Sequence, residues 1–390
     1  ASPASLQTLG FSHRWRLSGW YFFYFAFIGA FSPYFTLYLQ SLGLAAASIA
    51  ALMSLMSAMR LLAPNLWGWL AERSGRTLLV LRASALLSMV GFTGFFFTEA
   101  FWPLFAAMAA MSFFWSAVLP LVEALTLGHL AGRAELYGRV RLWGSVGFIV
   151  AVLGAGAWLD RAPIASLLWI ILALLVGIAL CSWLLGDAST GAVGPRLSLR
   201  GGLHRPEVRA LLAAGFFMSA AHGPLYVFYS IHLVEHGYDK TAVGVLWSLG
   251  VVAEIAVFVA MPRLLKSCSI RAILMLSFVA ATVRFLLIGW CADIFLVLLF
   301  AQLMHGATFG AHHAASVAAL NHWFPPRQQA RVQAMYGSIS FGAGGMLGNL
   351  LSGVSWEAVG PGLTFSGAAV LAAMGLLLVG RGIGRRRPVR

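Results

Sequence analysis

The sequence predicts an all-α membrane protein with twelve transmembrane helices, and three observations support this fold class. Of the 390 residues, 60% are hydrophobic and only 10% are charged, whereas a soluble domain carries about 25% charged residues. Apolar runs of roughly 20 residues, the length that spans a hydrocarbon core about 30 Å thick, recur twelve times. If the N-terminus is cytoplasmic, 21 of the 26 Lys and Arg residues fall on the cytoplasmic side of these runs.

The remaining five cations are informative because of where they lie. Arg161 and Lys240 fall on the outer side, while Arg60, Arg141 and Arg284 lie within spans. This asymmetry predicts cytoplasmic N- and C-termini. The net charge of +14 is therefore interpreted as a topology signal and not as a nucleic-acid interface. The cytoplasmic Lys and Arg side chains are expected to interact with anionic lipid headgroups.

The twelve predicted spans follow one another with short connections. They lie near residues 17–39, 44–70, 77–98, 101–129, 139–159, 163–186, 208–234, 241–264, 271–291, 293–321, 330–355 and 360–380. The polar, basic stretch 187–207 predicts a cytoplasmic linker. It separates an N-terminal six-helix bundle (1–186) from a C-terminal bundle with a basic tail (208–390).

The first two spans carry polar groups at depth. The first is rich in aromatic residues and is expected to be interrupted at Gly29 and Pro33; the Tyr24 hydroxyl is a candidate substrate contact. Arg60 lies 12 residues before Glu72, or about 18 Å along a helix, which places it near the membrane midplane. Because a charge facing lipid there costs about 2.5 to more than 10 kcal/mol, Arg60 is expected to face a water-lined cavity or an acid on another helix.

The connection after the second span carries a recognisable motif. Residues 68–76 read Gly-Trp-Leu-Ala-Glu-Arg-Ser-Gly-Arg, which resembles the signature loop of the major facilitator superfamily, with Glu72 in its acidic position and Thr77 where a basic residue is common. The resemblance implies the major facilitator fold, with two pseudo-symmetric six-helix bundles. It also implies that this loop locks one arrangement of the bundle and releases another, through Gly68, Glu72, Arg73, Gly75 and Arg76.

The two halves also repeat in sequence, in the same direction. Gly43 before the second span matches Gly237 before the eighth, an offset of 194 residues. The same offset places Arg60 opposite Glu254, and a direct pair between these two charges is one hypothesis. Tyr137-Gly138 and Tyr336-Gly337 form a second match, with an offset of 199.

An acid and an arginine mark the fourth and fifth spans. Glu123 follows Pro-Leu-Val, and Arg141 stands 18 residues later in Gly-Arg-Val-Arg-Leu-Trp-Gly. This arrangement is similar to the lactose permease branch of the superfamily, and the resemblance implies that both side chains bind substrate. The chain has Phe148 and Ser145 where the sugar permease has Trp and Cys, so these two are candidate substrate contacts for a solute other than a galactoside. A structural clasp between two helices is the alternative.

The second half contains the predicted proton-coupling residues. In the lactose permease branch a Glu, an Arg and a His–Glu pair handle the proton, and Glu254, Arg284 and His305 correspond to the first three of these. Thr308 stands where the second Glu would be, so Glu254 is the predicted proton carrier, and Glu123 or a histidine is a candidate for a second proton. Tyr226 and His305 are also candidate substrate contacts.

The surroundings of His305, with Tyr336-Gly337, resemble the phenylpropionate permease family. We therefore expect a proton symporter that imports a small organic solute, an aromatic or other carboxylate, across a bacterial-type inner membrane by alternating access. Its expected partners are that solute, protons and membrane lipids, and the protein is expected to be a monomer. A sugar or nucleoside symporter is the alternative. A drug or metabolite exporter is disfavoured because the fifth span has no proline and therefore no Gly-Pro antiporter motif.

Other classes of function have little support. No zinc-protease or nucleophile-elbow motif is present, so an intramembrane enzyme is not expected, and a sensor that binds without transport is a remote alternative. Cys181, Cys268 and Cys291 lack metal or redox spacing. We expect no metal and no cofactor.

Overall fold

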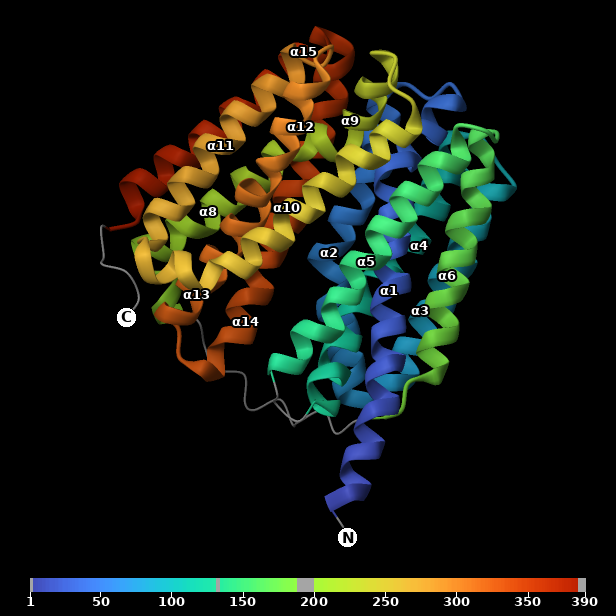
Figure 1. Ribbon diagram of the computed structural model, residues 1–390, viewed down its shortest axis with the longest axis vertical. Helices are drawn as coiled ribbons and strands as arrows, with labels where there is room; N and C mark the ends of the chain where they lie inside the picture. The colour runs from blue at the N-terminus through green and yellow to red at the C-terminus, as the bar shows by residue number, and fades with distance from the viewer. Residues whose placement is uncertain (1–2, 131–133, 188–199, 385–390) are drawn as a thin grey trace. The chain divides into compact units, whose positions relative to one another are not determined.

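The protein, described here by a computed structural model covering residues 3–130, 134–187 and 200–384, is almost entirely helical (Figure 1). Most of the predicted linker (188–199), the basic tail from residue 385 and Arg133 lie outside the described residues. The elements are α1 (Pro3–Ser41), α2 (Ala46–Ser74), α3 (Thr77–Thr93), η1 (Gly94–Phe96), α4 (Phe101–His129), α5 (Ala134–Leu159), η2 (Ile164–Ser166), α6 (Leu167–Leu184), α7 (Arg200–Leu203), α8 (Pro206–Ala221), α9 (Gly223–Glu235), α10 (Lys240–Ser267), α11 (Ile270–Trp290), α12 (Phe295–Leu303), η3 (Gly306–Ala311), α13 (His312–Trp323), α14 (Pro326–Gly337), η4 (Ser338–Gly344) and α15 (Gly345–Gly382).

Among the described residues, eleven helical segments are long and apolar enough to cross a membrane. The first ten correspond to the first ten predicted spans. The eleventh, Pro326–Gly382, contains 57 residues and would extend about 85 Å if it were one straight helix. It breaks at Gly360, whose φ of 81° is left-handed, and Pro361 follows. The eleventh and twelfth predicted spans lie on either side of this break.

Three details differ from the sequence-based prediction. The interruption expected at Gly29 and Pro33 does not occur, and α1 runs through both residues. The motif at 68–76 is mostly the last turns of α2 and not a loop; only Gly75, with φ 62°, takes a turn conformation before α3. The predicted seventh span is broken at His222, where α8 ends, because Pro224 has no N–H to donate to the preceding turn.

Two further irregularities were not predicted. The tenth span passes through a π-helical segment, η3, and the eleventh through another, η4. Such segments are rare in helices and are found frequently at functional sites. Both lie in the second of the two compact units of the chain. The first unit comprises Ala1–Leu44 and Met59–Ala192, and the second comprises Ala45–Ala58 and Val193–Arg390.

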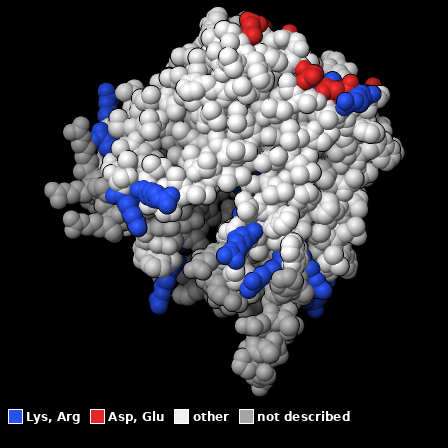
Figure 2. All heavy atoms as spheres, in the orientation of Figure 1, with Lys and Arg blue, Asp and Glu red and all other residues white. Residues whose placement is uncertain are grey.

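The surface agrees with a lipid environment. Figure 2 shows that most of the visible face is uncharged, with Lys and Arg in some patches and Asp and Glu in others. Large apolar side chains such as Leu62, Phe97, Val259 and Leu296 are more than half exposed. Apolar exposure on this scale is expected of a protein that meets lipid tails in place of water.

Within the first unit, α1 and α5 pack closely because glycine faces a neighbouring backbone (Figure 1). A Cβ on Gly147 would collide with the carbonyl oxygen of Phe22, and one on Gly29 would lie 2.5 Å from that of Phe148. Small residues at such crossings are how helices associate in lipid.

We therefore expect Gly147→Ala to destabilise the folded protein by about 1–3 kcal/mol, because the added methyl group must push the two helices apart. Thermal unfolding of the purified protein in detergent measures the effect. Gly154→Ala, on the same helix but with no atom within 4 Å of the added Cβ, is the matched control. Equal melting temperatures for the two variants would contradict this account of the packing.

Candidate functional site

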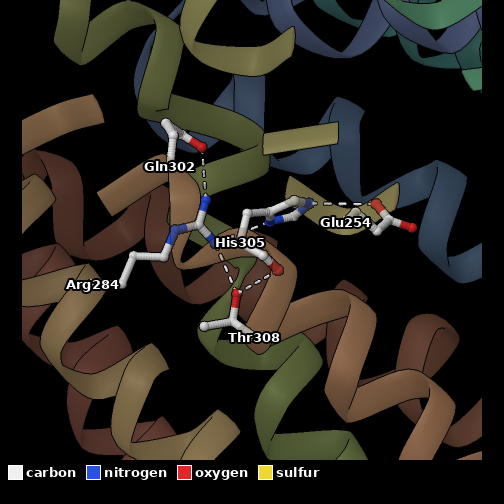
Figure 3. Close-up of polar contacts among 5 residues, drawn as sticks. All are labelled: Glu254, Arg284, Gln302, His305 and Thr308. Atoms are coloured by element: carbon white, nitrogen blue, oxygen red, sulfur yellow. Dashed lines mark hydrogen bonds and ion pairs between the residues drawn. The ribbon is translucent and has the colours of Figure 1, made fainter. Parts of the chain in front are cut away.

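A buried polar cluster in the second unit is centred on the guanidinium of Arg284 on α11, a residue that is 1% exposed. Its Nη2 donates to Oε1 of Gln302 at 3.0 Å, and its Nη1 donates to Oγ1 of Thr308 at 3.1 Å. Nη1 also lies 3.1 Å from Nδ1 of His305. Figure 3 shows these side chains converging on the guanidinium from α12 and the beginning of the π segment η3.

These contacts determine which nitrogen of His305 carries a proton. Arginine has five N–H donors and no acceptor, so the Arg284 contact requires Nδ1 of His305 to accept a hydrogen bond. A neutral imidazole then carries its proton on Nε2. A second proton on His305 would occupy Nδ1 and break the contact with Arg284.

The Nε2 of His305 faces Glu254 on α10, and the carboxylate Oε2 lies 3.9 Å away. Both side chains are shielded, with 11% of the His305 side chain and 21% of the Glu254 side chain exposed. Glu254 packs against the π segment at Gly310, where a Cβ would lie 3.3 Å from Cγ of Glu254. The series Gln302–Arg284–His305–Glu254 therefore links a buried cation to a carboxylate through one neutral imidazole (Figure 3).

The first unit holds the other predicted acid and arginine. Glu123 on α4 is half-buried and accepts a hydrogen bond from the Tyr137 hydroxyl at 3.3 Å. Arg141, one turn beyond Tyr137 on α5, lies over the ring of Phe25 with its guanidinium carbon 3.9 Å from the ring centroid, and 5.7 Å from that of Tyr21. No ion pair joins the two described side chains Glu123 and Arg141.

Glycine makes room for this cation–π contact. A Cβ on Gly144 would lie 2.6 Å from Cδ2 of Phe25 and 3.0 Å from Nη1 of Arg141. A guanidinium over an aromatic ring is attracted by the electrostatic field of the ring face. Arg141 is therefore held by aromatic rings, and Glu123 attracts it at longer range without forming a salt bridge.

The other predicted contacts in the first unit differ in accessibility. Tyr24 is 2% exposed, and its ring is stacked between Trp20 and Trp115. Phe148 is 8% exposed, and Ser145 is half-buried. Arg60 is exposed at the centre of the candidate span Ala46–Ser74. It belongs to the first unit and Glu254 to the second, and a direct pair between them stays a prediction.

The remaining predicted residues are one substrate contact in the second unit and the gating residues at the end of α2. Tyr226 on α9 is half-buried and stacks on Trp247 with ring centroids 6.1 Å apart. Among the predicted gating residues, Glu72, Arg73, Gly75 and Arg76 are exposed at the end of α2 and the start of α3, and Gly68 lies inside α2. Arg73 lies over the ring of Trp69, with its guanidinium carbon 5.4 Å from the ring centroid.

Sequence reasoning assigned no role in these clusters to several of their members. Gln302 stands three residues before His305 on the same helical face, and Tyr137 stands four residues before Arg141. Helical spacing of i, i+3 and i+4 was the available signal for both. Phe25 and Tyr21 gave no such signal, because their contact with Arg141 joins segments more than 100 residues apart. Among the described residues, no group of three or more His, Cys, Asp and Glu is placed to hold a metal ion.

Comparison with known proteins identifies the relatives of this chain. The family model described as MFS_1 like family matches residues 14–367. A probable 3-phenylpropionic acid transporter of Escherichia coli (strain K12) is 29% identical over 371 residues, covering 90% of this chain and 93% of that protein. A maltose permease of Geobacillus stearothermophilus is 27% identical over 372 residues, covering 93% of each.

Solved structures share the fold. A variant of the nucleoside transporter NupG has a TM-score of 0.84 at 18% identity, covering 94% of this chain and 99% of that one. A bacterial homologue of the human lysosomal transporter Spinster, inward-facing and occupied, has a TM-score of 0.71 at 15% identity, covering 98% of each chain. These proteins are transporters and not enzymes. The resemblance to the major facilitator superfamily and to the phenylpropionate permease family is thereby confirmed; the resemblance to the lactose permease branch stays a prediction.

Proposed function

Since the chain belongs to the MFS_1-like family, and is therefore a multi-pass membrane transporter of small molecules, we propose that it imports an organic carboxylate together with protons. The observation that carries the proton coupling is the series Arg284–His305–Glu254. Glu254 is the proton carrier in this proposal. When it is ionised, its carboxylate attracts the N–H on Nε2 of His305; when it is protonated, that attraction is weaker because the carboxyl group is neutral.

The change reaches Arg284 through the same imidazole. With Glu254 ionised, the Nε2 proton of His305 faces the carboxylate and Nδ1 accepts from Arg284. With Glu254 neutral, the His305 ring is held less strongly on its Nε2 side. The guanidinium of Arg284 can then exchange His305 for other hydrogen-bond partners. A transporter requires two arrangements that a ligand can bias, and an exchange of partners around a buried charge supplies them.

A carboxylate substrate is supported by the balance of charge within the spans. Three arginines (Arg60, Arg141 and Arg284) exceed two glutamates (Glu123 and Glu254). Arg284 is already bonded to three neutral groups, which leaves Arg141 and Arg60 to bind the anion. In this proposal Glu123, Tyr24, Ser145, Phe148, Tyr226 and His305 form the remaining substrate contacts. The relative named as a probable 3-phenylpropionic acid transporter supports an aromatic carboxylate.

The electrostatic work of moving an anion across the membrane favours its transport together with protons. Moving one negative charge inward against 100 mV costs about 2.3 kcal/mol. One proton per monoanion cancels this work, and a second proton, on Glu123 or a histidine, would allow the membrane potential to drive uptake.

The proposed topology has twelve crossings, with the break at Gly360 separating the last two and both termini in the cytoplasm of a bacterial-type inner membrane. The bundles 1–186 and 208–390, joined by the linker 187–207, alternate access to the substrate. The end of α2 with Gly68, Glu72, Arg73, Gly75 and Arg76 acts as the gate. The protein works as a monomer among membrane lipids.

An uncharged sugar or nucleoside is the second candidate substrate class. The maltose permease among the relatives and the NupG structures with the same fold support it. In that case Arg141 would hydrogen-bond hydroxyl groups, and proton entry would carry net charge inward.

Uptake into proteoliposomes under an imposed pH gradient tests the proposal. We expect 3-phenylpropionate to accumulate only with the gradient, and Glu254→Gln to lose accumulation while retaining counterflow, because exchange of solute does not require release of the proton. Glu99→Gln, at an exposed loop position, is the control. Accumulation that is indifferent to the gradient or to Glu254→Gln would remove proton coupling. Accumulation of maltose or a nucleoside in place of the acid would select the second class.

A further inference from the structure

A small cavity in the second unit lies where three helices lose their regular hydrogen bonding. His222 separates α8 from α9, and the π segments η3 and η4 interrupt the tenth and eleventh spans. The cavity has a volume of about 30 Å³, and residues from all three interruptions line it. They include Met218, His222, Tyr226, Thr308, His312 and Ser340.

Within the described parts of the chain, Nε2 of His222, Nε2 of His312 and Oγ of Ser340 are lining atoms that are buried without a hydrogen-bond partner. All three side chains are at least nine-tenths buried. The Nδ1 of His222 lies 2.8 Å from the carbonyl oxygen of Met218, which can only accept, so Nδ1 donates. The Nε2 of a neutral His222 therefore carries a lone pair and requires a donor.

The residues that line the cavity indicate which kind of molecule could form hydrogen bonds with these buried atoms. No Asp, Glu, Lys or Arg is among the lining residues, so nothing there compensates the charge of an ion. A cavity of this volume holds about two water molecules. Buried polar groups without protein partners are normally satisfied by ordered water, and irregular backbone at membrane depth is tolerated where it is buried in protein or lines a water-filled cavity.

We propose that this cavity is an internal water site, in which about two water molecules supply the hydrogen bonds that His222, His312 and Ser340 leave unmade. The water keeps the three helix interruptions solvated inside the membrane. The amides of η3 and η4 can then exchange hydrogen-bond partners, which a dry π segment in lipid could not do. The cavity shares Tyr226 with the proposed substrate contacts, but the presence of water in it does not depend on which substrate or coupling is correct.

Hydroxyl-radical footprinting of the purified protein tests for the water, because radicals generated from bound water label the side chains beside it. Met218 lines the cavity and Met261 does not, yet each is 4% exposed and both lie in the second unit. We expect Met218 to be oxidised several-fold faster than Met261. Equal oxidation rates of Met218 and Met261 would overturn the proposal of an internal water site. They would not affect the proposed transport function.

Two variants test which atoms hold the water. His312→Phe keeps a ring that can make the edge contact with Phe278, at 5.3 Å in the native protein, but removes both nitrogens; Ser340→Ala removes the hydroxyl. Each is expected to lower the Met218 labelling rate several-fold, to slow amide hydrogen exchange in 306–311 and 338–344, and to leave Met261 unchanged. His322→Gln, exposed on the same helix α13, is the control. Unchanged labelling and exchange in both test variants would overturn the assignment of the water to these groups.

Discussion

Replacing Arg284 with alanine is expected to abolish proton-driven uptake and to destabilise the second unit, because three buried polar groups lose the donor that they share. The guanidinium satisfies Gln302, Thr308 and His305 at once. Without it these polar groups remain buried with no replacement donor, and each unmade hydrogen bond carries a desolvation cost of about 1–3 kcal/mol.

Arg284→Lys tests whether a positive charge is sufficient at this position without the planar geometry of the guanidinium. Lysine keeps the cation but has a single nitrogen and no planar fork, so it cannot reproduce contacts made by both Nη1 and Nη2. We expect it to recover stability in part and proton-driven uptake hardly at all. Thermal unfolding and proteoliposome uptake provide the two measurements, and Arg161→Ala, at an exposed position, is the control. Full gradient-driven uptake by Arg284→Ala would show that the series Arg284–His305–Glu254 has no part in coupling.

Arg141→Ala is expected to weaken binding of an aromatic carboxylate by about 10- to 100-fold, because a hydrogen bond to a charged group contributes about 1.5–3 kcal/mol. In the structure Arg141 lies over Phe25 and forms no ion pair with the described side chain of Glu123. Arg141 is therefore not held in a salt bridge that a ligand carboxylate would have to break, although Glu123 attracts it at longer range.

Isothermal titration calorimetry with 3-phenylpropionate and with its neutral amide measures how much the charge of Arg141 contributes to binding. The native protein should prefer the acid, and Arg141→Ala should bind both with similar affinity. Arg139→Ala, two residues away and exposed, should behave as the native protein does. A variant lacking Arg141 that still prefers the acid would place the carboxylate elsewhere, with Arg60 as the next candidate.

The candidate site could be predicted in part because a membrane makes charge conspicuous. Arg60, Glu123, Arg141, Glu254 and Arg284 stand out in apolar runs since each is costly at depth unless it is paired or hydrated. The structure brings Arg284, His305 and Glu254 together, and their role in coupling stays a prediction. It also shows partners that no charge pattern could single out: Gln302 and Thr308 for Arg284, and Phe25 for Arg141.

The helical, membrane-embedded character and the family were determined by the sequence itself, because the transfer of apolar runs into lipid is a local, nearly additive property of consecutive residues, and because the motif at 68–76 is contiguous. The tertiary structure alone decided which partners surround Arg284, how close α1 lies to α5 at Gly147, and where η3, η4 and the break at His222 meet around one cavity. These features depend on contacts between helices far apart in the chain, where the energy of each backbone conformation is set by what packs against it.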